Sequence, residues 1–251
     1  MSNFERAANS WYQQPPGSWL TELERSQLAY VFAKCHGDFL MQIGGARDLL
    51  HCIDLPVKHH VHLVTESILS ACPHIQADVS ELPIQPDSVD VILLAHVLEF
   101  AKSPVRLLKD IYQLLSPGGQ LIILGFNPWS YWGLYKLFKR NGEWPWGGKF
   151  WSRAQVKQWL RACDCSIRVN KTLCFRSPCG TPHNRQLTLF IETLGQICAP
   201  AIGGVYLIVA RKKVCQPIRE KKQALWWKKH TIVRGVIEPT GFGMRDEKHS
   251  G

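Results

Sequence analysis

Small or polar residues follow three apolar runs of the chain, at the points where each run would end as a strand. These residues are Gly44-Gly45, Glu66 and His96. A glycine turn lets a ligand approach the backbone closely, and a carboxylate can accept hydrogen bonds from both hydroxyls of a ribose. Because ligands bind outside the carboxyl ends of the strands in open α/β sheets, the pattern indicates a site for a nucleoside-containing ligand.

Each of these residues also has a purely structural interpretation. Most glycine pairs are plain turns, and Glu66 is equally well explained as an exposed residue that opens a helix. His96 can shape a pocket or act as a base, but we prefer a histidine that is held by hydrogen bonds for structural reasons. The sequence therefore leaves the catalytic residue unassigned.

The stretch 77–128 predicts the elements that would position this edge. Residues 89–95 form a near-continuous apolar run, which is typical of a strand buried on both faces of a parallel sheet. Ser103 and Pro104 suit the start of a helix, and the sequence 116–119, Ser-Pro-Gly-Gly, ends it. A second apolar run, 121–126, follows, so the stretch predicts a right-handed βαβ crossover.

The same stretch resembles the second half of a class I S-adenosylmethionine-dependent methyltransferase domain of the type 11 kind. The resemblance rests on Asp78, on Leu82-Pro83, and on three phrases: 87–90 (Asp-Ser-Val-Asp), 96–99 (His-Val-Leu-Glu) and 116–119 (Ser-Pro-Gly-Gly). It extends over about 38–126, somewhat over a third of the chain.

The resemblance implies S-adenosylmethionine as the cofactor, with roles for particular residues. Asp78 would accept a hydrogen bond from the adenine amino group, and the backbone N–H of Val79 would meet a ring nitrogen. An Asx turn or a helix N-cap is the structural alternative for Asp78. The complete set of predicted cofactor-binding residues is Gly44, Gly45, Glu66, Asp78, Val79, Ala95 and His96, and no metal site is predicted.

The glycine turn departs from the pattern of the resembled family. That family usually shows an acidic residue followed by Gly-x-Gly-x-Gly, whereas here Gln42 and Ile43 precede Gly44-Gly45-Ala46. About 15 residues separate Gly45 from the second predicted strand, 60–64, and a parallel crossover usually needs a dozen or more residues, including its helix. We therefore expect the first two crossover helices to be shortened or replaced by loops.

The predicted fold is α/β: a Rossmann-like, doubly wound, mostly parallel seven-stranded sheet with an antiparallel C-terminal strand. A helix over about 18–36 precedes the first strand, and in the resembled family a helix in this place covers the cofactor. Later elements are a helix over 152–163 and strands over 166–175 and 205–210.

Residues 129–151 form an aromatic insertion that holds five of the ten tryptophans, with basic residues interleaved. An amphipathic helix followed by a loop rich in glycine and proline fits this sequence. Three functional interpretations compete: a lid over an apolar substrate, an interfacial membrane contact and a stacking platform for bases. The structural alternative is an insertion that packs its aromatic rings on the sheet. The resembled family keeps its substrate-recognition elements at this position beside the ligand-binding edge, and this resemblance favours the lid.

The charge of the chain is concentrated at its C-terminus. The net charge is +10, and residues 211–251 hold eleven Lys or Arg against four Asp or Glu, which leaves +7 there. We predict a flexible lead (1–17), a methyltransferase-like domain (18–213) with a helical insertion (184–204), and a basic, partly disordered tail (214–251). Basic residues mixed with tryptophans in the tail suit RNA or anionic lipid.

The cysteines indicate a reducing compartment, and the first residues and the run 187–210 bear on targeting. The nine cysteines form no Cys-x-x-Cys pair and complete no metal site. The first residues lack the apolar core of a signal peptide. The run 187–210 is long enough to span a bilayer, but Glu192, Pro200 and internal glycines favour a helix, a turn and a strand. We expect a cytoplasmic protein without a transmembrane segment.

The predicted function is transfer of a methyl group from S-adenosylmethionine to an unidentified acceptor, a small molecule with apolar compounds among the candidates. The alternative is a catalytically reduced methyltransferase-like module that binds RNA, a protein or a membrane surface through the aromatic insertion and the basic tail.

Overall fold

The computed structural model describes residues 2–46, 49–50, 53–64, 74–76, 84–139, 144–178 and 185–214. All of them lie in one compact unit, Met1–Val214, while Cys215–Gly251 form a second unit. The predicted basic tail beyond Val214 therefore lies outside the described residues.

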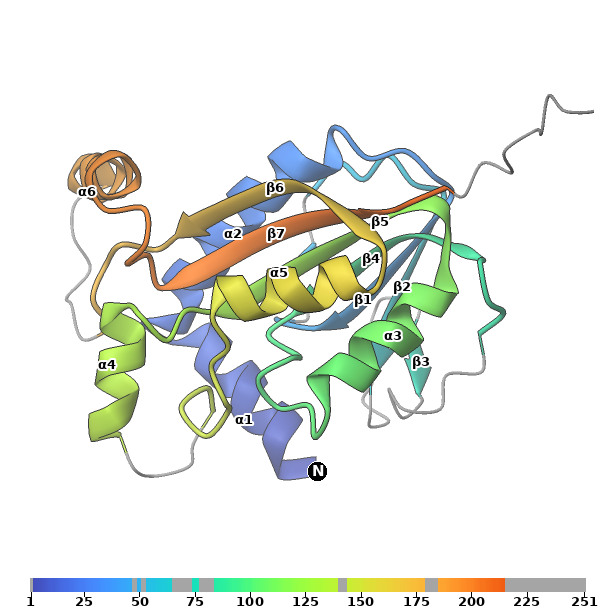
Figure 1. The fold of residues 1–251 in the computed structure, drawn as a ribbon. Coiled ribbons are helices and arrows are strands. Elements are labelled where there is room, and N and C mark those ends of the chain that lie inside the picture. The colour runs from blue at the N-terminus through green and yellow to red at the C-terminus, as the bar shows by residue number, and fades with distance from the viewer. Residues whose placement is uncertain are drawn as a thin grey trace, which may run out of the picture. The chain divides into compact units, whose positions relative to one another are not determined.

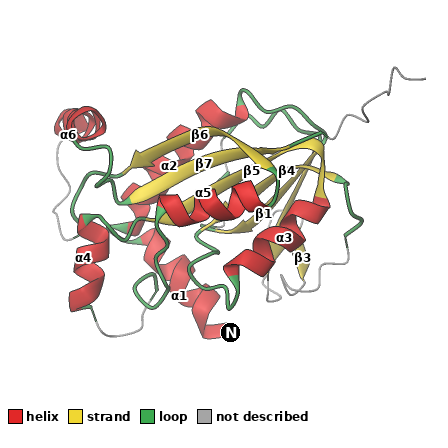
Figure 2. Ribbon diagram, viewed as in Figure 1, coloured by secondary structure: helices red, strands yellow, loops and turns green. Residues whose placement is uncertain are grey.

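A seven-stranded sheet organises the described residues (Figures 1 and 2). Its order is β3-β2-β1-β4-β5-β7-β6. The first five strands run parallel, and β7 is antiparallel to both of its neighbours. The strands are β1 (Phe39–Gly44), β2 (His59–Val64), β3 (His74–Gln76), β4 (Val89–Ala95), β5 (Leu115–Phe126), β6 (Cys165–Leu173) and β7 (Val205–Lys212). This confirms the predicted Rossmann-like sheet and its antiparallel last strand.

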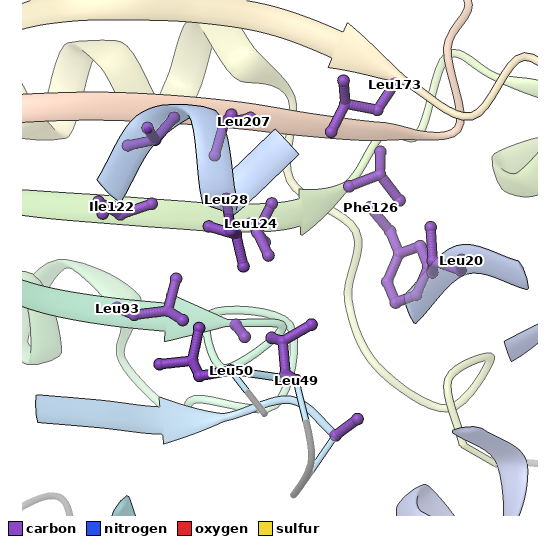
Figure 3. Close-up of a cluster of buried hydrophobic side chains, with 14 of the residues drawn as sticks. Leu20, Leu28, Leu49, Leu50, Leu93, Ile122, Leu124, Phe126, Leu173 and Leu207 are labelled. Carbon is purple, nitrogen blue, oxygen red and sulfur yellow. The ribbon is translucent and has the colours of Figure 1, made fainter. Parts of the chain in front are cut away.

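Helices cover both faces of the sheet (Figure 1). The described helices are α1 (Ser2–Gln13), α2 (Gly17–Phe32), α3 (Pro104–Leu114), α4 (Tyr131–Phe138), α5 (Arg153–Ala162) and α6 (Arg185–Cys198), of which α4 and α6 lie at one end of the sheet. On one face, Leu28 of α2 packs in a cluster with Leu93 of β4 (Figure 3), and on the other Leu108 of α3 and Val156 of α5 pack in a cluster with Ile92. Because alternate residues of β4 face opposite covers, the strand is apolar on both faces except at Asp90, near its start.

The helix boundaries follow from local signals in the sequence. Proline lacks a backbone N–H, and the first position of α3, which Pro104 occupies, does not require one. Ser103 occupies the N-cap position as predicted. In α5 the Ser152 hydroxyl accepts from the backbone N–H of Gln155. In turn, Oε1 of the Gln155 side chain accepts from the backbone N–H of Ser152. This capping box satisfies two backbone donors at the start of α5.

The predicted flexible lead is wrong, because residues 2–13 form helix α1. Its last turn is anchored by aromatic rings: Tyr12 is buried, and the Trp11 and Tyr12 rings lie 4.7 and 4.6 Å from that of Trp144. The contact that orders the lead comes from more than a hundred residues further along the chain, so the local sequence did not indicate it.

Three other predictions can be compared with the described residues. No helix lies between Gly44 and His59 in the residues described there, as the short spacing predicted. The run 187–210 divides into α6, a turn and β7, and none of the described helices is long and apolar enough to cross a membrane. Among the described residues no cluster suits a metal ion, and the five cysteines described there are unpaired.

Candidate functional site

The glycine turn packs directly against the end of β4. Gly44 pairs with Ala95 across the sheet, and Gly44 and Gly45 have φ values of +70° and +78°. A Cβ atom on Gly44 would lie 2.6 Å from the carbonyl oxygen of Ala95, and one on Gly45 would lie 2.7 Å from the Ala95 Cβ. Both positions therefore require glycine for their conformation and for space. The structure thus brings three predicted site residues together.

The side chain of Gln42 holds this turn by hydrogen bonds to its backbone. Its side chain is fully buried, and its Nε2 donates to the carbonyl oxygens of Gly44, at 3.0 Å, and Ala46, at 3.2 Å. A carboxylate cannot donate a hydrogen bond, so an acidic residue at this position could not make either contact. The amide is therefore a local requirement of this turn.

His96 begins a buried polar cluster immediately after Ala95. Its imidazole Nε2 lies 2.7 Å from Oε1 of Glu24 on α2, and its Nδ1 lies 3.8 Å from Oε1 of Glu99. All three side chains are almost fully buried. Burial alone would lower the pKa of His96, but the two carboxylates outweigh it and raise the pKa to about 9. His96 is therefore an imidazolium at neutral pH.

Glu24 and Glu99 were not among the predicted site residues. Glu99 belongs to the 96–99 phrase, and its Oε1 accepts from the backbone N–H of Phe126 at 2.6 Å. Glu24 lies four residues from both Leu20 and Leu28, on the apolar face of α2. A charged residue on a buried helix face needs a partner, so this spacing was the available signal for Glu24.

Several polar atoms of the cluster have no hydrogen-bond partner in the described part of the chain. They are Oε2 of Glu24, Oε2 of Glu99, Nδ1 of His96 and the hydroxyl of Tyr12. Burial, together with the nearby Glu24 and Glu99 carboxylates, raises the pKa of Tyr12 well above its ordinary value. A buried polar atom without a partner costs about 1–3 kcal/mol, so these atoms can bind a ligand that supplies partners. We call Tyr12, Glu24, His96 and Glu99 the carboxylate cluster.

Aromatic rings enclose the carboxylate cluster. The Phe126 ring lies 4.2 Å from the imidazole of His96, and the Trp144 ring lies 6.3 Å from it. Trp132 and Phe150 stack on Phe126 from the aromatic insertion. Four aromatic residues of the insertion, Trp132, Trp144, Trp146 and Phe150, are therefore buried, as the structural alternative predicted, while Trp129 is 77% exposed. The role of the insertion as a lid stays a prediction.

The adenosine half of the predicted site lies outside the described residues. Glu66 follows β2 and Asp78-Val79 follow β3, and both strands are present and parallel as predicted. The structure thus brings together Gly44, Gly45, Ala95 and His96, and leaves the other three as predictions.

Comparisons with known proteins agree with this architecture. Residues 53–123 match the family model described as "Methyltransferase domain". The match includes Glu66, Asp78-Val79 and Ala95-His96 and begins after the glycine turn. The chain is also 29% identical over 222 residues to an Escherichia coli (strain K12) protein described as "Uncharacterized protein YafS", covering 86% of this chain and 87% of that one. The resemblance to the type 11 methyltransferases is confirmed by the family match.

Solved structures share the fold at low identity. A possible histamine N-methyltransferase from Thermotoga maritima aligns with a TM-score of 0.55 at 18% identity over 78% of this chain and 97% of its own. A methyltransferase from Archaeoglobus fulgidus gives 0.54 at 17% identity over 76% and 94%. The [4+2]-cyclase SpnF gives 0.53 at 17% identity over 79% and 81%. The fold alone therefore does not decide the reaction.

Proposed function

We propose that this protein is an S-adenosylmethionine-dependent methyltransferase that acts on a small apolar acceptor. The observation that carries the proposal is the Gly44-Gly45 turn, which lies against Ala95 at the carboxyl edge of β1 and β4. Ligands of open α/β sheets bind at this edge, where the strand order reverses. The family match over 53–123 supports methyl transfer as the reaction.

The described residues fit the methionine half of this cofactor. Because Gly44 and Gly45 carry no side chains, the turn presents its backbone at the carboxyl edge of β1, where a ligand can approach it closely. Oε2 of Glu24 and of Glu99 are free acceptors for a cationic or hydrogen-bond-donating group. When bound, the cofactor supplies a methyl group already activated on a sulfonium ion. Glu66, Asp78 and Val79 are proposed for its ribose and adenine.

The residues of the chain contribute positioning and exclusion of water. His96 is protonated at neutral pH, so it is a positioning residue and does not accept the acceptor's proton. Phe126 and Trp144 shield the cluster from solvent and offer apolar contact to an acceptor. Holding an acceptor in line with an activated methyl group supplies a large part of the rate, so the proposal assigns no general base.

Calorimetric titration with S-adenosylhomocysteine tests the proposal. We expect saturable binding by the wild type that is lost in Gly45→Val and in Asp78→Ala. Gly118→Val is the matched control, because Gly118 also has a positive φ, +81°, but lies at the start of β5, away from the carboxyl edge. A folded wild type that does not bind would contradict the proposal.

Localisation in the cytoplasm is part of the same proposal, and the five unpaired cysteines among the described residues support a reducing compartment. The catalytically reduced module is the alternative. Its basic tail lies beyond the described residues, and none of the described contacts favours the loss of catalysis that distinguishes this alternative from the enzyme.

A further inference from the structure

Helices α4 and α6 each expose large apolar side chains. The set on and beside α4 is Trp129, Tyr131, Leu134, Leu137 and Phe138, and the set on α6 is Phe190, Leu194 and Ile197. Phe138 is 77% exposed and Ile197 is 73% exposed. Single exposed apolar residues are ordinary, but a contiguous set marks an interaction site. We call these eight residues the apolar end.

The spacing places each set on one helix face. Tyr131, Leu134 and Phe138 are three and four residues apart, and Phe190, Leu194 and Ile197 are four and three apart. Residues at these intervals are neighbours on a helix surface. Each helix therefore presents a continuous apolar stripe to solvent.

The charged side chains of both helices turn away from these stripes. Lys136, the charged residue of α4, donates to the carbonyl of Gly148, and burial lowers its pKa. Among the described side chains of α6, Glu192 is the charged one; it is buried and accepts from the backbone N–H groups of Cys174 and Phe175. A helix that is apolar on its outer face as well as its inner one normally lies within an apolar environment.

The two helices lie at the same end of the sheet (Figure 1). Trp132, the inward residue of α4, and Glu192, the inward residue of α6, line one pocket together with Trp19 and Arg176. The two helices that carry the stripes are therefore neighbours, at the end where β5 leaves the sheet.

We propose that the apolar end docks on a lipid bilayer with anionic headgroups. Lys139 and Lys149 are exposed beside α4, and their positive charge is complementary to an anionic surface. Tryptophan and tyrosine favour the membrane interface, and Trp129 and Tyr131 stand at the start of the α4 stripe. An amphipathic helix in the interface buries its apolar side chains to a shallow depth, which suits short helices such as α4.

This docking site is close to the carboxylate cluster. Trp132 of α4 stacks on Phe126 at 5.7 Å, and Phe126 lies 4.2 Å from His96. An acceptor that partitions into the bilayer would thus reach the proposed site from the docked face. The docking proposal itself does not depend on methyl transfer, because its test measures only lipid binding.

The test is co-sedimentation of the full chain with two kinds of vesicle, phosphatidylcholine alone and phosphatidylcholine mixed with phosphatidylglycerol. We expect binding to the mixed vesicles that weakens as salt rises. Leu137→Glu/Phe138→Glu and Leu194→Glu/Ile197→Glu should each reduce the affinity about tenfold or more, because each removes apolar surface from the contact. The matched control is Tyr30→Glu/Val105→Glu, which adds the same charge at exposed apolar positions on α2 and α3 and should bind like the wild type.

Three results would overturn the proposal. The first is that the wild-type protein binds neither kind of vesicle. Binding that persists in both glutamate pairs is another, since the basic tail would then account for it. A dimer that dissociates in the glutamate pairs, without lipid binding in the wild type, is the third and would assign the surface to a second copy. If a glutamate pair unfolds, judged by circular dichroism, Leu137→Ser/Phe138→Ser and Leu194→Ser/Ile197→Ser replace them with the same expectation.

Discussion

The imidazole Nε2 of His96 lies 2.7 Å from Oε1 of Glu24, and both side chains are buried. The two residues are 72 positions apart, on the end of β4 and on the covering helix α2. This contact joins the cover to the edge of the sheet at which we propose that the cofactor binds. The protonation of one imidazole thus affects both the packing of α2 and the charge of the site.

The stability of the protein should depend on the protonation of His96. The pKa of His96 is about 9 in the folded protein, above the ordinary value of 6.5. A raised folded-state pKa stabilises the protein fully below the unfolded-state value, and this contribution is lost as pH rises through the folded value. We therefore expect the free energy of unfolding in urea to fall by about 2–4 kcal/mol between pH 6.5 and 9.

His96→Asn should abolish most of this decline. Asparagine removes the titrating group, and it tolerates the left-handed conformation that His96 adopts at φ +55°. Glu24 and Glu99 act directly on the imidazole, and Tyr12, Lys136, Cys174 and Tyr206 interact with these two carboxylates; all six are unchanged in this variant. His59→Asn, at an exposed histidine of β2, is the control and should keep the decline. An unchanged pH profile in His96→Asn would show that another group is responsible.

Glu24→Gln should lower the pKa of His96 towards its ordinary value. The amide retains an oxygen that can accept from Nε2 but removes the charge that favours the imidazolium, leaving burial to act with less opposition. The measurement is an NMR titration of the His96 ring resonances in both proteins. Glu22→Gln is the control, because Glu22 is an exposed glutamate on the same helix, and it should leave the titration of His96 unchanged. An unaltered pKa of His96 in Glu24→Gln would show that the charge of Glu24 does not raise this pKa.

Trp144→Ala should destabilise the protein strongly. Its ring contacts Trp11 and Tyr12 of α1 and lies beside Phe126, so truncation leaves a cavity between the first helix and the sheet edge. Loss of a buried tryptophan costs about 3–5 kcal/mol. Urea unfolding of Trp144→Ala and Trp129→Ala makes the comparison, because Trp129 is 77% exposed and its loss should have little effect. Equal effects of the two substitutions would contradict the assigned packing.

The parts of the fold that depend on local patterns were predicted from the sequence. The apolar run 89–95 is β4 to the residue, and helix α3 begins at Pro104 as its Ser-Pro start indicated. Gly44-Gly45 and Ala95 were placed at one edge because parallel strands put their carboxyl ends on the same side. These features need no information from distant residues.

The parts that depend on distant contacts were not predicted. Helix α1 is ordered against Trp144, and Glu24 acquires its role only from His96, 72 residues further along the chain. A single sequence does not indicate which buried charge meets which partner. The structural interpretation of the aromatic insertion, in which its rings pack on the sheet, holds for only some residues: Trp132 and Trp144 are buried, while Trp129 and Phe138 are exposed.

Gln42→Glu tests whether the departure from the acidic pattern is required by this turn. The glutamine Nε2 donates to the carbonyl oxygens of Gly44 and Ala46, and a carboxylate would face both of them without a proton to share. Its side chain is fully buried, so we expect a loss of about 2–4 kcal/mol in the free energy of unfolding. Gln113→Glu, at an exposed position of α3, is the matched control and should be nearly neutral.

We expect binding of S-adenosylhomocysteine to weaken in Gln42→Glu alone, because the turn that it disturbs lines the proposed pocket. A variant of full stability that binds more tightly than the wild type would instead mean that an acidic residue suits this site, and that Gln42 is not needed to hold the turn.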